Sequence, residues 1–282
     1  MKNRLERANL FQCMREMNAM SADVRLLVRV DDAGSSWSSN IGCLRACSEG
    51  IARSVEVMMP CSWVAHAATL FNAQPEIDIG IHLALTSEWD AVKWRPLTQA
   101  PSLVDEQGDF LPMVMPREGD VRPCLADVDW SIDEIANEFR AQISLGVAMF
   151  RSVSHVSSHM LKHFKDFDPK VGEVVCDLCH EFGLADDAYG YGLPRFEGYP
   201  KFLRNAAFRT AGFMDHLAGL SRGTYIFIDH PAVNSPELEA TGHEGYEDVA
   251  ADRSTCLETL VSVALKRKID DLGIELISYR DL

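Results

Sequence analysis

The sequence predicts an α/β protein whose parallel strands form a barrel or a barrel-like sheet. Short apolar runs alternate with helical patterns along the chain, which is typical of strand–helix–strand units. Most of the predicted strands end in polar, potentially reactive residues. At 282 residues and 47% hydrophobic composition, the chain can bury a large core. A doubly wound open sheet is the alternative, but the first strand is followed by Asp-Asp-Ala-Gly-Ser-Ser, which is not a glycine-rich phosphate loop.

The first part of the chain contains three predicted strands and two predicted helices. The apolar run at 26–30 suits a buried strand, and Gly34 permits a sharp turn after it. Pro60 ends the second strand, and Gly50 ends the first helix after a polar capping loop at 35–40. In order, we expect a strand at 25–32, a helix at 41–49, a strand at 54–60, a helix at 63–72 and a strand at 78–85.

The segment at 86–128 interrupts this alternation. It contains five prolines and a turn at 105–108. A long irregular segment in a compact domain is usually functional, so we predict a lid or substrate loop, with a surface insertion on the barrel rim as the alternative. Residues 1–22 are predicted to form a helical extension or a loose arm. Together these features predict a single domain spanning residues 1–282.

Strand–helix alternation resumes after this segment. Ser131 and Glu134 have the spacing of a capping box, which predicts a helix start. The apolar face of this helix should contain Ile135, Phe139, Ile143 and Val147. The remaining predicted elements are a strand at 153–160, a helix at 168–183, a short strand at 183–187, a helix at 199–220, a strand at 224–231, a helix at 248–266 and a strand at 274–279.

Composition and charge exclude several classes of partner. The formal net charge is −15, which argues against nucleic acid and gives no reason to expect an anionic membrane surface. The N-terminus lacks the apolar core of a secretory signal, and no stretch approaches a membrane span, so we expect a cytoplasmic protein. Cys176 and Cys179 form a lone CxxC within a predicted helix, and we interpret them as ordinary thiols rather than zinc ligands.

Potential metal ligands and proton-transfer groups lie at the ends of four predicted strands. They are Asp31 and Asp32, His82, His155 and His159, and Asp229 and His230. A lone histidine in a strand is more often a hydrogen-bonded core residue. However, a hydrolytic metal site needs about three imidazole or carboxylate ligands, a carboxylate to take a proton from water, and a proton donor for the leaving group. Asp32, His82, His159, Asp31 and His230 supply that combination.

Several short motifs occur along nearly the whole chain. They are Val-Asp-Asp-Ala-Gly at 30–34, Ser-Ser-Asn-Ile-Gly at 38–42, Glu-Gly-Ile-Ala-Arg-Ser at 49–54, Ile-Gly-Ile-His-Leu-Ala-Leu-Thr at 79–86, Pro-Ser-Leu-Val-Asp-Glu-Gln-Gly at 101–108, Ser-His-Val-Ser-Ser-His at 154–159, Ile-Asp-His-Pro at 228–231 and Ile-Ser-Tyr-Arg-Asp-Leu at 277–282. In these motifs and in their order, the chain resembles a known family, the YdjC-like (ChbG/HpnK-type) carbohydrate deacetylases.

The resemblance implies a divalent-metal hydrolase that removes N-acetyl groups from amino sugars or short chito-oligosaccharides. It implies a distorted seven-stranded β/α barrel and a homodimer. The metal, Mg²⁺ or Zn²⁺, would be held by Asp32, His82 and His159. Asp31 would be the general base, and His230 the general acid or transition-state stabiliser.

The sequence departs from the family pattern at three positions. Ala33 replaces an aromatic residue, Ser157 replaces an aspartate, and Leu161 replaces a histidine, although His163 is kept. We expect the Ser157 change to remove a carboxylate that orients His159, which would weaken metal affinity.

Two alternatives stay open, the first of them because of these departures. The first is a catalytically weak relative that binds carbohydrate without turnover. The second is another metal-dependent hydrolase, such as a phosphoesterase or a glycosidase with paired carboxylates. We also expect at least one tryptophan to form a sugar-stacking surface, with core packing as the alternative. The candidates are Trp37, Trp63, Trp89 and Trp94.

Overall fold

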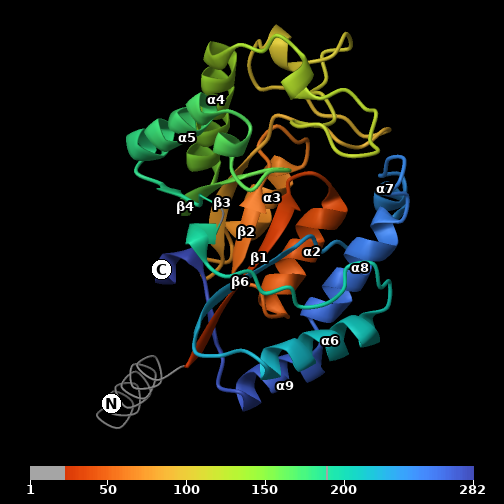
Figure 1. The fold of residues 1–282 in the computed structure, drawn as a ribbon. Helices are drawn as coiled ribbons and strands as arrows, with labels where there is room; N and C mark the ends of the chain where they lie inside the picture. Colours follow the sequence, from red (N-terminus) through yellow and green to blue (C-terminus); the bar gives the residue numbers. More distant parts are fainter. Residues whose placement is uncertain (1–22, 189) are drawn as a thin grey trace.

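The computed structural model describes residues 23–188 and 190–282, so the predicted extension at 1–22 lies outside the described residues. Seven parallel strands form one sheet that curls into a half-barrel, as the sequence predicted (Figure 1). The strands are β1 (Val24–Ala33), β2 (Ser54–Val57), β3 (Asp78–Leu83), β4 (Val153–Ser158), β5 (Ala185–Asp186), β6 (Gly223–Asp229) and β7 (Glu275–Ile277).

Strand β1 is the centre of the sheet. The strand order is β5-β4-β3-β2-β1-β6, and β7 pairs with β1 outside this path. Residues 24–30 of β1 pair with β6, while the opposite edge of β1 pairs with β7 at 25–27 and with β2 from Arg29 onwards. The aliphatic side chains at 26–28 are fully buried, which explains why this apolar run occupies the middle of the fold.

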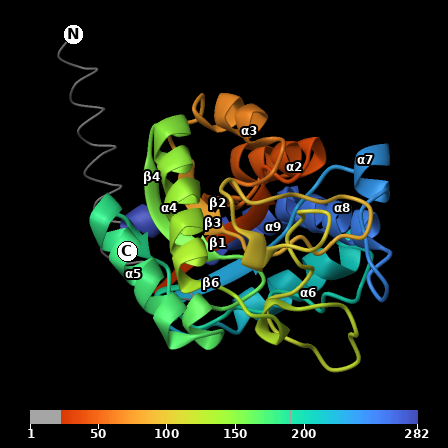
Figure 2. The ribbon, with the colours of Figure 1, turned by 90° about the horizontal axis from the view of Figure 1, so that it is seen from above.

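Helices cover the outer face of the sheet, in two groups (Figures 1 and 2). Helices α4 and α5 pack together beside β3, while α6 packs against both α8 and α9. The bounds are α2 (Trp37–Ser48), α3 (Val64–Phe71), α4 (Ile132–Met149), α5 (Pro169–Phe182), α6 (Ala206–Ala218), α7 (Pro236–Glu239), α8 (Val249–Leu260) and α9 (Val263–Asp271). None of the described helices is long and apolar enough to cross a membrane.

Three helix predictions were wrong at their ends. Helix α2 begins at Trp37 rather than residue 41, because the side chain of Ser36 accepts a hydrogen bond from the Ser39 amide. The predicted helix at 199–220 starts only at Ala206, after the cap Asn205. The predicted helix at 248–266 is two helices, since Ser262 caps a new one.

Helix α4 differs from its prediction in two details. The Ser131 side chain caps it as expected, but the Glu134 carboxylate accepts hydrogen bonds from Ser102 instead of completing a capping box. Val147 is exposed, and Gly146 rather than Val147 is the last buried residue of α4.

The segment at 86–128 lies at the end of the sheet to which the strands point (Figure 1). Its regular structure consists of two three-residue 3₁₀ helices, Pro101–Leu103 and Leu125–Asp127. The buried Glu138 of α4 holds this segment by accepting hydrogen bonds from the backbone of Leu97 and Thr98. The thiols are free at all seven cysteines that the structure describes, Cys176 and Cys179 among them.

Candidate metal centre

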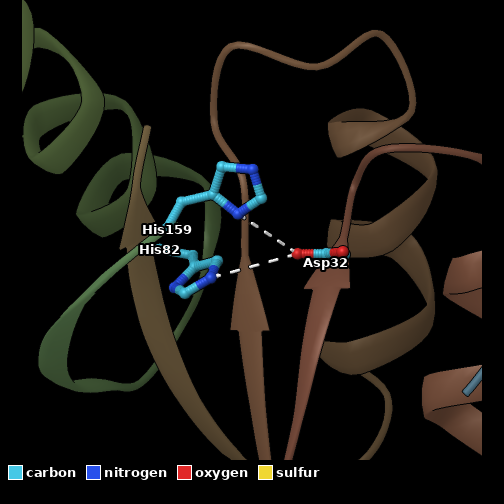
Figure 3. Close-up of side chains that lie close together, drawn as sticks. All are labelled: Asp32, His82 and His159. Atoms are coloured by element: carbon cyan, nitrogen blue, oxygen red, sulfur yellow. Dashed lines mark ion pairs between the residues drawn. The ribbon is translucent and has the colours of Figure 1, made fainter. Parts of the chain in front are cut away.

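Three potential ligand atoms converge at the carboxyl ends of the central strands (Figure 3). Asp32 lies near the end of β1, His82 lies in β3, and His159 follows β4 directly. The Asp32 Oδ1 atom is 3.9 Å from His82 Nε2 and 3.4 Å from His159 Nδ1. One potential ligand atom from each residue lies within 4.8 Å of the others, and all three residues are buried.

A distortion of β1 brings both aspartates to this site. Neighbouring side chains of a regular strand point to opposite faces of the sheet. Asp32, however, has a φ of 69°, and the pairing of β1 with β2 shifts register between Val30 and Ala33. Aspartate is among the residues that tolerate this left-handed conformation. The resulting bulge breaks the alternation, so Asp31 and Asp32 both line one cavity.

The environment of the Asp32 carboxylate fits a cation. Its Oδ2 atom accepts a 2.7 Å hydrogen bond from Arg253 Nη2. Its Oδ1 atom is buried and has no hydrogen-bond partner among the described residues. A buried carboxylate oxygen without a donor is costly, and here it faces two imidazole nitrogens. This donor set of one oxygen and two nitrogens suits a divalent metal ion.

The two histidines carry different charges in the metal-free site. Burial lowers the pKa of His82 well below its usual value, and the charges of His159 and Arg29 lower it further, so His82 is neutral. Burial also lowers the pKa of His159, but the Glu88 and Asp32 carboxylates outweigh it and raise this pKa to about 10. A proton on His159 therefore supplies positive charge where a metal ion would otherwise supply it.

Each histidine is held by a polar partner behind it. His159 Nε2 lies 3.1 Å from Glu88 Oε2, and His82 Nδ1 lies 2.7 Å from Ser157 Oγ. The prediction that residue 157 orients His159 is therefore wrong, because its hydroxyl contacts His82. Such partners fix the ring orientation of a metal-binding histidine.

Asp31 is fixed by an arginine from its own strand. Arg29 donates two 2.7 Å hydrogen bonds, one to each carboxylate oxygen of Asp31. The same guanidinium contacts Asp187 and the Tyr279 hydroxyl, so its position is determined from three directions. Asp31 Oδ2 lies 3.7 Å from His82 Nε2, which places this carboxylate at the edge of the metal centre.

His230 follows the end of β6 and is the most accessible of the predicted site residues, with 36% of its side chain exposed. Its Nδ1 atom lies 3.5 Å from Asp229 Oδ1. Burial raises the pKa of Asp229, but Lys201, His230 and Tyr199 outweigh it and hold this pKa far below its usual range. Asp229 is thus an ionised neighbour that faces the His230 ring.

These residues share a cavity of about 440 Å³, a size suited to a small ligand. Trp89 also lines it, but its ring already has two partners. The Arg253 guanidinium lies 5.2 Å from the centroid of the ring, and the His243 ring stacks on it with 5.8 Å between the ring centroids. Trp94 is buried, and its indole nitrogen donates a 2.6 Å hydrogen bond to Thr86 O. Trp94 therefore has the core-packing role that was the alternative to sugar stacking.

Sequence reasoning missed three residues that build the centre. Arg29 had a visible signal, because it is a charged residue two positions before Asp31 in an apolar strand. Glu88 lies in the irregular segment, where no periodic pattern indicated which way its side chain points. Arg253 comes from α8, 221 residues from Asp32, and nothing in the sequence linked the two.

Comparisons with known proteins agree with this architecture. A chitooligosaccharide deacetylase of Yersinia enterocolitica is 31% identical over 271 residues, which cover 91% of this chain and 98% of that protein. A carbohydrate deacetylase of Brevibacillus brevis is 28% identical, over 92% of this chain and 100% of that protein. A solved structure from Enterococcus faecalis V583, of a proposed cellobiose-phosphate cleavage protein, has a TM-score of 0.71 at 22% identity and covers 91% of this chain and 98% of its own.

A family model matches most of the residues that the structure describes. The model of the YdjC-like protein family matches residues 25–271, a range that includes Asp31, Asp32, His82, His159 and His230. The chain belongs to the YdjC-like protein family.

Proposed function

We propose that this protein is a metal-dependent deacetylase that hydrolyses the N-acetyl group of amino sugars or short chito-oligosaccharides. Two curated relatives that align over nearly the whole chain carry deacetylase names. The observation that carries the proposal is the buried Asp32 Oδ1 atom, which accepts no hydrogen bond from the described residues and faces His82 and His159 at the base of a ligand-sized cavity.

Asp32, His82 and His159 would hold the metal ion through Oδ1, Nε2 and Nδ1. A bound divalent ion supplies a Lewis acid that polarises the acetyl carbonyl and lowers the pKa of water. Two imidazole ligands favour zinc over magnesium, because magnesium prefers an all-oxygen environment. We therefore propose Zn²⁺ as the better match for this donor set.

The other predicted residues would move protons. Asp31 would accept a proton from the attacking water, and Arg29 holds that carboxylate in place with two hydrogen bonds. His230 would donate a proton to the leaving sugar amine, because it is accessible from the cavity and is paired with the ionised Asp229. Arg253 keeps Asp32 ionised and oriented.

The segment at 86–128 contributes Glu88 and Trp89 to the cavity wall. This contribution supports our proposal that the segment is part of the substrate site rather than a surface insertion. The homodimer and the cytoplasmic location stay predictions.

Acetate release from N,N′-diacetylchitobiose tests this function. Metal-stripped protein would be assayed with and without Zn²⁺, Co²⁺, Mn²⁺ or Mg²⁺, alongside Asp32→Asn. We expect metal-dependent release that the variant abolishes. Sugar binding without acetate release would favour a carbohydrate-binding relative instead. Release of phosphate or cleavage of a glycosidic bond from other substrates would favour a different metal-dependent hydrolase.

A further inference from the structure

A buried polar network lies directly behind His82. Glu56 of β2 is fully buried, and its Oε2 atom accepts a hydrogen bond from Ser157 Oγ. The same Ser157 Oγ atom is 2.7 Å from His82 Nδ1. The second Glu56 oxygen, Oε1, is 2.6 Å from Nε2 of the fully buried His155. The network therefore connects a carboxylate on β2 to the imidazole on β3 through a hydroxyl on β4.

The hydrogen count fixes the direction of these bonds. A serine hydroxyl has one hydrogen, and Ser157 donates it to Glu56. Ser157 Oγ must then accept its other hydrogen bond, so His82 carries its proton on Nδ1. The Nε2 lone pair of the neutral His82 is left free, and Nε2 is the atom that faces Asp32. The network thus selects the tautomer that can bind a metal ion.

The same reasoning gives the charge of His155. Ser154 donates its hydrogen to Asp78, so it accepts from His155 Nδ1, 2.7 Å away. His155 Nε2 faces a carboxylate oxygen and also carries a proton, which makes the ring a cation. Burial opposes this charge, but Glu56 raises the pKa of His155 above its usual value. The buried Glu56 carboxylate therefore has a compensating charge beside it.

A glycine in strand β3 provides the space for this network. Gly80 of β3 lies next to it, and a Cβ atom added there would collide with the Glu56 carboxylate and the His155 ring. Glycine weakens a strand interior and often marks a close approach of other groups. The absence of a side chain at position 80 therefore permits Glu56 to reach across from β2 to Ser157.

We propose that Glu56, acting through Ser157, is the positioning residue for His82. The pair would replace the single carboxylate that the family pattern places at position 157, with the charge moved from β4 to β2, on the other side of β3. Glu56 is not a catalytic residue, because it touches neither the ligand cavity nor the reacting atoms. This inference rests on the proposed metal site but not on the identity of the substrate.

Metal affinity and histidine tautomers test the proposal independently of catalysis. Zn²⁺ affinity would be measured by chelator competition for Ser157→Ala, for Glu56→Gln and for a matched control, Ser154→Ala. The first two variants should lose about 10- to 100-fold in affinity, the usual effect of removing such partners. The control contacts His155 and Asp78 but not His82, so its affinity should equal that of the wild type.

A double variant provides the rescue. In Glu56→Gln/Ser157→Asp, the carboxylate moves to position 157, where it can accept directly from His82. The amide at position 56 can donate to the new aspartate and accept from His155. We expect this double variant to regain most of the affinity that the single changes lose. If the double variant loses as much Zn²⁺ affinity as the weaker-binding single variant, or more, the proposal is overturned.

Nitrogen-15 NMR of the metal-free protein reads the tautomer directly. The His82 ring should show a protonated Nδ1 and an unprotonated Nε2 in the wild type, and a mixture in Ser157→Ala. A wild-type ring protonated on Nε2 would overturn the proposal even if the Glu56 variant failed to fold. If the tautomer and affinity results hold while acetate is not released, this inference stands and the proposed function fails.

Discussion

Metal binding at this site should expel a proton from His159. The imidazole lies between two carboxylates, with Nδ1 3.4 Å from Asp32 and Nε2 3.1 Å from Glu88. Their charges raise the pKa of His159 to about 10 despite its burial. At pH 7 only about one metal-free molecule in a thousand would then have Nδ1 ready for a ligand bond. The apparent affinity for metal should therefore rise about tenfold for each pH unit from 7 towards 9.

The raised pKa of His159 also predicts how the stability of the metal-free protein depends on pH. The pKa of His159 in the folded protein is above the ordinary value of 6.5, so its proton stabilises the fold fully below pH 6.5. That contribution is lost progressively as pH rises from 6.5 to about 10. The stability of the metal-loaded protein should lack this dependence, because the ion occupies the place of the proton.

Two measurements check whether metal binding expels a proton from His159. Zn²⁺ affinity would be determined with chelator buffers at pH 7, 8 and 9, and proton release by calorimetry in two buffers with different ionisation enthalpies. The matched variant Glu88→Gln removes one of the two carboxylates, so its affinity should depend less steeply on pH. An affinity that is constant from pH 7 to 9, with no proton released, would refute the reasoning.

Three further predictions follow from the packing and the site. His230→Ala should lower kcat by about 10²–10⁴ while metal content, measured by atomic emission, stays at the wild-type level; a loss of metal would contradict the proposed acid role. Trp94→Ala should destabilise the fold by about 3–5 kcal/mol in urea unfolding because Trp94 is buried, and an unchanged stability with a raised KM would restore the sugar-stacking interpretation. Gly42→Ala should destabilise by about 1–3 kcal/mol, because an added Cβ would collide with the backbone of Pro231 and Ala232. The control Gly212→Ala, where the same atom has ordinary contacts, should not destabilise.

The sequence predicted the convergence of Asp32, His82 and His159 for a simple physical reason. The carboxyl ends of parallel strands meet at one edge of a sheet, so polar residues that follow separate strands become neighbours. The repeated strand–helix alternation predicted the sheet in the same way. Helix ends were less predictable, because single caps such as Ser36 and Ser262 decided them.

The supporting residues were harder to predict because they depend on contacts between distant segments. Arg253 reaches Asp32 from α8, and Glu88 reaches His159 from a segment without periodicity. The Glu56 network could partly be predicted, since His155 and Ser157 lie two positions apart and therefore on one face of β4. Glu56, a charged residue in the short buried strand β2, was the corresponding signal on the other side of β3.

A crystal of Zn²⁺-loaded protein measured at the zinc absorption edge gives the most direct test of the central claim. The account predicts one strong anomalous peak bonded to Asp32 Oδ1, His82 Nε2 and His159 Nδ1. A peak elsewhere in the molecule, or one that excludes either histidine, would contradict the proposed metal centre and the deacetylase mechanism built on it.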